Sequence, residues 1–163
     1  MSLMDAPSYD PTRDNQRRNL IIGAVVAVLL LGLVAFAGYV SGHGWMFSNL
    51  GYEHRVNTFF DVLQEKDYAK AYGIYYNDPN WQEHPQKYSG YPLARFTEDW
   101  TKDSPIHEPI TWHHVDKSVA AGSGYFGTGV IVAVRVNGGH KIFMYVNRAD
   151  KTLTWPAPYI FQY

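Results

Sequence analysis

Hydrophobic residues first form one uninterrupted run, over residues 20–40, which contains no charged side chain. A helix rises about 1.5 Å per residue, and the hydrocarbon core of a bilayer requires about 20 apolar residues. The run therefore predicts a single transmembrane helix. A buried core helix and a cleaved signal peptide are the alternatives. Ala35 and Ala37 flank Phe36 in the small-x-small pattern that signal peptidase prefers, so cleavage near Ala37 is the specific form of the second alternative.

Charges on the two sides of this run predict its orientation. Three arginines precede it within a few residues: Arg13, Arg17 and Arg18. Only Arg55 follows within about 15 residues, and positive side chains stay on the cytoplasmic side. We therefore expect residues 1–19 to be an irregular cytoplasmic tail and the bulk of the chain to lie outside the cytoplasm. The predicted location is the inner, or cytoplasmic, membrane, crossed once with the N-terminus in the cytoplasm.

A short segment separates the run from the rest of the chain. Residues 41–44 read Ser-Gly-His-Gly and are expected to end the helix. We assign residues 41–52 to a juxtamembrane linker, in which Trp45 suits the headgroup level of a bilayer. Residues 53–163 then form one small domain close to the membrane.

A helical period begins at the start of this domain. Val56, Phe59, Phe60 and Leu63 fall at positions i, i+3, i+4 and i+7, which predicts an amphipathic helix with these four residues in the core. A second helix is expected after the N-cap residue Asp67. A third, short helix is expected from Pro92. These two helices contribute further predicted core residues, among them Tyr72, Phe96 and Trp100.

The second half of the domain shows β-strand patterns. Three or four strands are expected, over residues 110–119, 130–136, 140–146 and, as the fourth, 152–155. The sequence Asn-Gly-Gly at residues 137–139 predicts a tight hairpin between the middle two. Helices followed by an antiparallel meander define the α+β class. We predict two to three helices packed on a curved antiparallel sheet.

The segment of residues 56–72, Val-Asn-Thr-Phe-Phe-Asp-Val-Leu-Gln-Glu-Lys-Asp-Tyr-Ala-Lys-Ala-Tyr, resembles the opening helices of cone-shaped α+β domains of the nuclear transport factor and ketosteroid isomerase type. It is especially similar to membrane-anchored bacterial members of unknown function. The resemblance covers about residues 53–156 and implies a pocket between helices and sheet. Candidate pocket residues are Tyr72, Phe96, Trp100, Trp112 and His114.

Some members of that superfamily catalyse isomerisation or dehydration with an aspartate or histidine in the pocket, but their motifs do not map onto this chain. Strand alternation places His114 on the same face as Trp112, where it would serve as a general base beside Asp61 or Asp99. The alternative is a structural histidine. We assign no catalytic residue, and the histidine spacing predicts no metal site and no cofactor.

Composition narrows the function classes further. The net charge of −1 argues against nucleic acid as a partner, and the absence of cysteine excludes disulfides and thiolate chemistry. Aromatic residues are abundant in loop 77–91 and at the C-terminus, where rings often anchor interfaces. The interface candidates are Trp81, Tyr88, Tyr91, Trp155, Tyr159, Phe161 and Tyr163.

Three functions remain open. The first is a non-catalytic accessory or structural subunit, with the lipid bilayer and other membrane protein subunits as partners. The second is a binding module for a small apolar ligand or peptide. The third is an enzyme of the isomerase or dehydratase kind.

Overall fold

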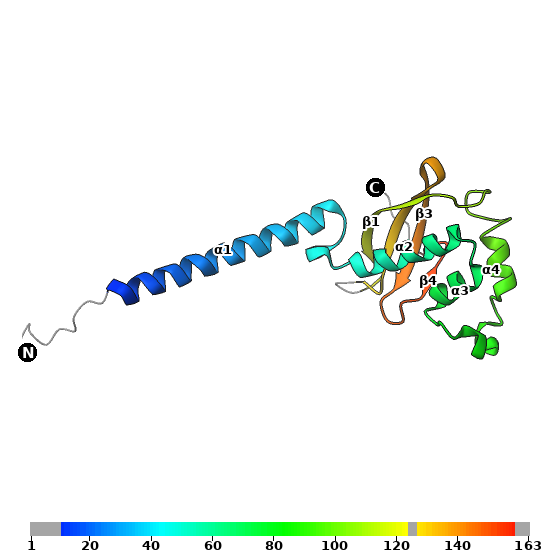
Figure 1. Cartoon of the computed structure of the whole chain (residues 1–163), viewed down its shortest axis with the longest axis horizontal. Helices are drawn as coiled ribbons and strands as arrows, with labels where there is room; N and C mark the ends of the chain where they lie inside the picture. Colours follow the sequence, from blue (N-terminus) through cyan, green and yellow to red (C-terminus); the bar gives the residue numbers. More distant parts are fainter. Residues whose placement is uncertain (1–10, 124–126, 159–163) are drawn as a thin grey trace, which may run out of the picture.

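The computed structural model describes residues 11–123 and 127–158, which form one long helix and a small α+β domain (Figure 1). The predicted fold class is confirmed. The α-helices are α1 (Pro11–Ser41), α2 (Leu50–Gln64), α3 (Tyr68–Tyr76) and α4 (Leu93–Asp99). The strands are β1 (His113–Ala121), β2 (Gly129–Val136), β3 (His140–Asn147) and β4 (Leu153–Thr154). Short 3-10 turns are η2 (Trp45–Phe47), η3 (Trp81–Glu83), η4 (Pro85–Tyr88) and η5 (Asn137–Gly139).

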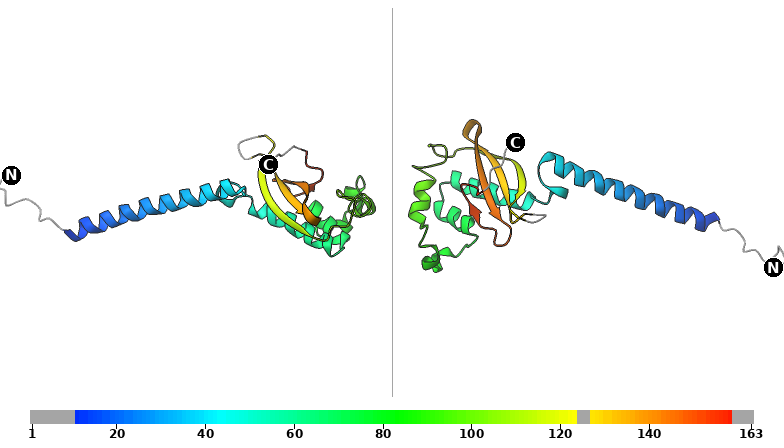
Figure 2. Two further views of the ribbon diagram at one scale, coloured as in Figure 1. Left: turned by 90° about the horizontal axis from the view of Figure 1, so that it is seen from above. Right: turned by 180° about the vertical axis from the view of Figure 1, so that it is seen from behind.

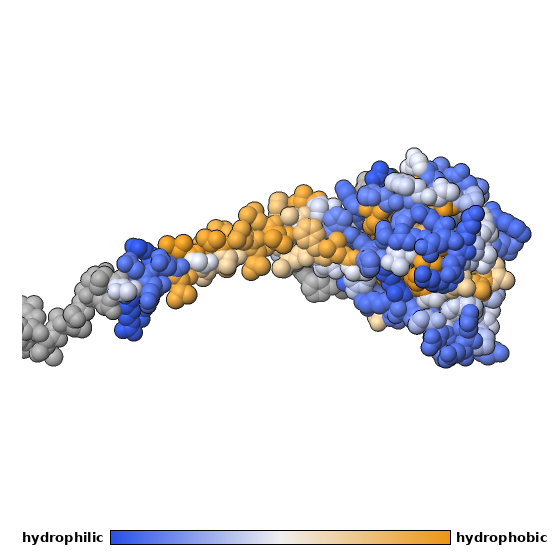
Figure 3. Space-filling view, viewed as in Figure 1, coloured by the Kyte–Doolittle hydropathy of each residue, from blue (hydrophilic) through white to orange (hydrophobic). Residues whose placement is uncertain are grey.

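Helix α1 extends away from the domain. By length and composition, its segment Thr12–Ser41 is long and apolar enough to cross a membrane. Figure 3 shows an apolar surface along most of the helix, with a hydrophilic patch at its N-terminal end. Within Thr12–Ser41 all residues are exposed except Ala35 and Gly38. Residues 11–19, expected to be irregular, are instead the first turns of this helix.

The sheet is a curved antiparallel meander with the strand order β1-β2-β3-β4 (Figure 2). The predicted hairpin joins β2 to β3, with Val136 opposite His140. Gly138 in η5 has a φ of 75°, a value that the Asn-Gly-Gly sequence accommodates at little cost. β1 contains an irregularity between Val115 and Lys117.

α2 lies along one face of the sheet, α3 lies beside α2 and contacts β4, and α4 packs on α3 (Figures 1 and 2). The predicted helical core is confirmed, since Val56, Phe59, Phe60, Leu63, Tyr72, Phe96 and Trp100 are all buried. From β2 the core receives Val130, Val132, Val134 and Val136. The interior therefore consists largely of aromatic rings packed against a valine-rich strand.

Two elements of the domain begin three residues away from their predicted start. α2 begins at Leu50, so residues 50–52 belong to the helix and not to the linker. β1 begins at His113, three residues later than expected. The side-chain oxygen of Asn137 accepts hydrogen bonds from the backbone N–H groups of Thr111 (2.8 Å) and Trp112 (3.1 Å). The backbone N–H groups of residues 111 and 112 therefore bind this side chain and not the backbone of a neighbouring strand.

Candidate functional site

The connection between α1 and the domain is compact. After Ser41 the chain reverses, and η2 lies against the last turns of α1. A side chain on Gly38 would place its Cβ 2.6 Å from the backbone nitrogen of Phe47 and 2.7 Å from the carbonyl oxygen of Gly44. Only glycine allows this approach. The reversal also places Met46 and Phe47 in the left-handed region, with φ values of 51° and 58°.

A buried polar cluster fastens this connection to the domain. Glu53 on α2 is 6% exposed, and its carboxylate accepts a hydrogen bond from the hydroxyl of Ser118 on β1. The same carboxylate lies 2.9 Å from Nδ1 of His43. The backbone N–H of Ser118 donates to the carbonyl oxygen of Gly42 at 2.7 Å. We call these four residues the junction cluster, because they join the end of α1 to both α2 and β1.

Large apolar side chains surround the junction cluster on the outside. Trp45 is 60% exposed, and Met46 and Leu50 are each 49% exposed. They follow the apolar helix α1 directly in the sequence. Amphipathic rings such as that of Trp45 prefer the headgroup level of a bilayer. The junction thus presents a surface suited to the membrane interface.

The predicted pocket residues fall into two separate groups. Three of them, Tyr72, Phe96 and Trp100, are fully buried core residues whose rings contact one another edge-on or tilted. Trp112 is instead 47% exposed, and its ring stacks on that of His114 at 6.3 Å. The rings of the first three fill the space between helices and sheet, where the resemblance had implied a pocket.

The two adjacent histidines of β1 have exchanged their expected roles. His113, and not His114, faces the helices: its side chain is 6% exposed and its ring stacks on Phe60 at 5.5 Å. The side chain of His114 is 57% exposed and its Nε2 lies 3.7 Å from Asp116. Trp112 and His114 do share a face, as alternation predicts, but it is the exposed face. Alternation groups residues by face and does not by itself identify which face is buried.

The surroundings of His113 explain its chemistry. Its Nδ1 lies 2.6 Å from the amide nitrogen of Gln64, and its Nε2 lies 3.1 Å from the amide oxygen of Asn57. Burial lowers the pKa of His113, and the carboxylate of Asp61, 3.7 Å away, partly opposes this shift. Asp99, the other predicted partner, binds Arg95 at 2.9 Å. Both ring nitrogens of His113 have partners, which is typical of a structural histidine.

The described aromatic interface candidates lie against the core. Tyr88 is 6% exposed and donates to a carboxylate oxygen of Asp78 at 2.5 Å. The Trp81 ring lies 4.8 Å from the ring of Tyr72, and the Trp155 ring lies 5.8 Å from that of Trp100. These rings are therefore largely part of the interior and do not form the exposed aromatic surface that the sequence suggested.

Tyr91 is held in the same way. Its hydroxyl donates to a carboxylate oxygen of Asp99 at 2.8 Å, and burial together with this carboxylate raises the pKa of Tyr91. The remaining candidates, Tyr159, Phe161 and Tyr163, lie outside the described residues.

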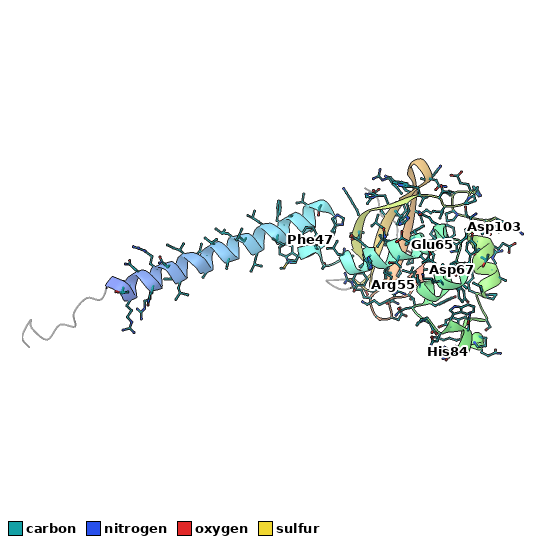
Figure 4. All side chains as sticks on the ribbon, viewed as in Figure 1. Phe47, Arg55, Glu65, Asp67, His84 and Asp103 are labelled. Carbon is teal, nitrogen blue, oxygen red and sulfur yellow. The ribbon has the colours of Figure 1, made fainter. Side chains whose placement is uncertain are left out.

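Two neighbouring surface hollows were missed by the sequence reasoning. One, of about 640 Å³, lies along α3, and the other, of about 540 Å³, lies along the first turns of α2. Both are lined by Arg55 and Ile74. Figure 4 places Arg55 on α2, on the side of the domain nearer to α1. Lys151, from the turn between β3 and β4, completes the second hollow, and no local sequence pattern links it to α2.

No family model, curated protein or solved structure matches this chain. Within residues 11–123 and 127–158, no group of three or more histidine, aspartate or glutamate side chains is placed to hold a metal ion. The function must therefore be argued from the geometry of the chain itself.

Proposed function

We propose that this protein is a single-pass membrane protein whose domain, fixed rigidly on its membrane span, docks as a non-catalytic accessory subunit on a larger membrane protein complex. In this proposal α1 spans a bacterial inner membrane, the N-terminal tail is cytoplasmic and the domain is extracytoplasmic. The arginines before the apolar segment support this orientation, because positive side chains remain on the cytoplasmic side.

The junction cluster is the observation that carries the proposal. A flexible linker would suffice to keep a soluble enzyme or binding module near a membrane. Here the carboxylate of Glu53 is buried between His43 and Ser118, and Gly38 admits the backbone of η2. Such a connection restricts the orientation of the domain relative to α1. A fixed orientation is useful when one face of the domain must meet another protein embedded in the same membrane.

The interior of the domain supports a role other than catalysis. The residues proposed for a pocket are core rings or exposed surface residues, and both nitrogens of His113 are engaged by amide groups. These features also weaken the two alternatives, an apolar ligand-binding module and an isomerase-like enzyme. We also propose that the domain belongs to the cone-shaped nuclear transport factor and ketosteroid isomerase type. The order of its helices and strands and the packing of helices on the sheet support this assignment.

The test is co-purification of the full chain from native membranes in a mild detergent. The wild type is compared with Gly38→Leu, which forces α1 and η2 apart, and with Gly32→Leu, a position with nothing within 4 Å of the added Cβ. We expect the wild type and Gly32→Leu to retain the same membrane protein partners, and Gly38→Leu to lose them while still inserting.

Three results would count against the proposal. If wild type brings down no membrane protein, docking is wrong. If Gly38→Leu retains every partner, the fixed orientation has no role in docking. If Gly32→Leu loses the partners as completely as Gly38→Leu does, the contact runs through the face of α1 and not through the oriented domain.

A further inference from the structure

Three cationic side chains lie near Tyr52 at the start of α2: Arg55 comes from α2 itself, and Arg148 and Lys151 come from the turn between β3 and β4. The Nζ of Lys151 lies 4.4 Å from the centre of the Tyr52 ring, and the guanidinium carbon of Arg148 lies 5.0 Å from it. Both side chains also donate to the Tyr52 hydroxyl, at 2.9 and 3.3 Å. Arg55 lines the hollow of about 540 Å³ together with Tyr52 and Lys151. We call Arg55, Arg148 and Lys151 the cation cluster.

The positive charge of this cluster is not balanced. Among residues 11–123 and 127–158, no carboxylate forms an ion pair with any of the three cations. The nearby carboxylate of Asp150 instead accepts hydrogen bonds from the backbone and side chain of Thr152, at 2.9 and 2.7 Å. Other arginines of the domain do pair: Arg135 lies 2.7 Å from a carboxylate oxygen of Asp116.

Hydrogen bonding within the cluster is also incomplete. The Nε atoms of Arg55 and Arg148 are buried and have no hydrogen-bond partner among the described residues. A buried cationic donor without an acceptor is unusual and destabilising. The hydrogen bond from Lys151 lowers the pKa of Tyr52, which is consistent with a positive potential at this place. The cluster therefore lacks an anion that would balance its charge.

The cations are held in position before any ligand arrives. The turn between β3 and β4 is closed by hydrogen bonds from Lys151 N to Asn147 O (3.0 Å) and from Lys151 Nζ to Arg148 O (2.9 Å). Lys151 has a φ of 62°, so the turn directs its side chain back toward α2. Arg55 donates to the carbonyl oxygen of Ile74 at the end of α3. Preorganised donors lose little entropy when they bind.

We propose that the cation cluster is a binding site for the phosphate group of an anionic ligand. Arginine and lysine side chains recognise phosphate oxygens by charge-assisted hydrogen bonds. Arg55 and Lys151 line the open hollow, and Arg148 lies with Lys151 at the Tyr52 ring, so the three offer donors to several oxygens of one phosphate. The hydroxyl-bearing Thr58 lines the same hollow. A phospholipid headgroup and a soluble phosphate ester share this chemistry.

A phospholipid can supply the phosphate group only if α1 spans a membrane, as the proposed function states. The recognition of phosphate by the cation cluster does not depend on that proposal. The hollow lies on the first turns of α2, which begins at the exposed Leu50 beside η2. If α1 spans a membrane, this part of α2 is close to the headgroup layer. An anionic phospholipid such as phosphatidylglycerol would then reach the cluster from the bilayer itself.

The test measures binding to the full chain in two settings. In a non-ionic detergent, the thermal unfolding midpoint is followed against inorganic phosphate and glycerol phosphate, with chloride at equal ionic strength as reference. In nanodiscs, the same midpoint is compared between phosphatidylcholine alone and a mixture with phosphatidylglycerol. A ligand that binds only the folded state raises the midpoint.

We expect Lys151→Gln and Arg148→Gln each to weaken the response about tenfold, because each removes a charge-assisted hydrogen bond. Lys102→Gln, an exposed lysine outside the hollow, should leave it unchanged. The midpoint of each variant without added anion shows whether it still folds, and ³¹P NMR of the phosphate reports binding independently of stability.

A response to soluble phosphates identifies a soluble ester as a ligand source. A response confined to phosphatidylglycerol identifies the headgroup. The proposal is overturned if chloride acts as strongly as phosphate, if Lys102→Gln reduces the response as much as Lys151→Gln does, or if neither setting gives a response. Loss of partners in the co-purification experiment would not by itself affect this result, so the two proposals fail separately.

Discussion

Two polar clusters lie on different faces of the first turns of α2, and they are built in opposite ways. In the junction cluster, the buried carboxylate of Glu53 has a partner on each side, His43 and Ser118. In the cation cluster, Arg55, Arg148 and Lys151 have no carboxylate partner in the described chain. Successive helix residues are separated by about 100°, so Glu53 and Arg55 point to nearly opposite sides of α2.

This difference indicates two kinds of role. A polar group that is buried and fully paired contributes to the fold, and removing one partner leaves the others unsatisfied. A group of like charges at an open hollow contributes little to the fold and is available to a ligand. The two clusters therefore respond differently to mutation, and the predictions below use that contrast, from the largest expected effect to the smallest.

The largest effect is expected at the junction cluster. Glu53→Ala should lower the free energy of unfolding by about 1–3 kcal/mol, because the buried hydroxyl of Ser118 and the ring of His43 lose their acceptor. Chemical unfolding of the full chain in detergent measures this. The matched control is Glu65→Ala, an exposed glutamate just after α2, which should change stability by no more than about 0.5 kcal/mol. Equal losses in both variants would show that the junction cluster is not a stabilising unit.

A pH dependence of intermediate size is expected from His113, a third polar site that is paired but titratable. Burial lowers its folded pKa, so the unfolded chain binds a proton more readily. Its contribution to stability is fully present above the unfolded pKa of 6.5 and is lost as the pH falls from there through the lowered folded pKa.

The measurement is unfolding free energy between about pH 7.5 and about pH 5, where histidine titrates. His113→Gln should flatten the decline relative to wild type, whereas His140→Gln, at an exposed histidine of β3, should retain it. The neighbouring Asp61 opposes the effect of burial, so Asp61→Asn should steepen the decline. An unchanged decline in His113→Gln would assign the pH dependence to other groups.

The smallest effect is expected at the cation cluster in the absence of anions. Lys151→Gln removes one of three like charges, and the relief of repulsion offsets its lost hydrogen bonds to Tyr52 and Arg148. The unfolding free energy should change by less than about 0.5 kcal/mol, as for ordinary surface substitutions. A loss as large as that of Glu53→Ala would place Lys151 among the residues that hold the fold, and the contrast between the clusters would disappear.

The fold was predictable to the extent that local patterns determine it. The spacing of Val56, Phe59 and Phe60 identified α2 and its buried face, and the Asn-Gly-Gly sequence identified the hairpin. Alternation grouped Trp112 with His114 correctly but did not show that their face is the exposed one. The later start of β1 was also missed, because the side chain of Asn137 binds residues 111 and 112 outside the strand. No sequence period reports a contact made by a side chain 25 or 26 residues away.

The candidate sites were less predictable for the same reason. Ser118 and Glu53 are 65 residues apart, and Lys151 and Tyr52 are 99 apart, so only the folded chain brings them together. The aromatic residues of loop 77–91 were predicted to form an exposed interface. The rings of Trp81 and Tyr88 instead pack against the ring of Tyr72. Gly38 hinted at the junction by its residue type, because glycine permits close backbone approach. The sequence alone does not show that the backbone of η2 is the segment that lies against it.

The orientation of the domain on α1 is the central claim, and pulsed electron paramagnetic resonance of the full chain in nanodiscs tests it most directly. The chain contains no cysteine, so Leu33→Cys on α1 and Lys102→Cys on the domain introduce two unique spin-label sites, both exposed. We predict one narrow distance distribution, which broadens when Gly38→Leu opens the junction but not with Gly32→Leu. If the spin-labelled protein with Gly38 unchanged gave a broad distribution, indistinguishable from that of Gly38→Leu, the domain would be only tethered to α1. That result would contradict the account.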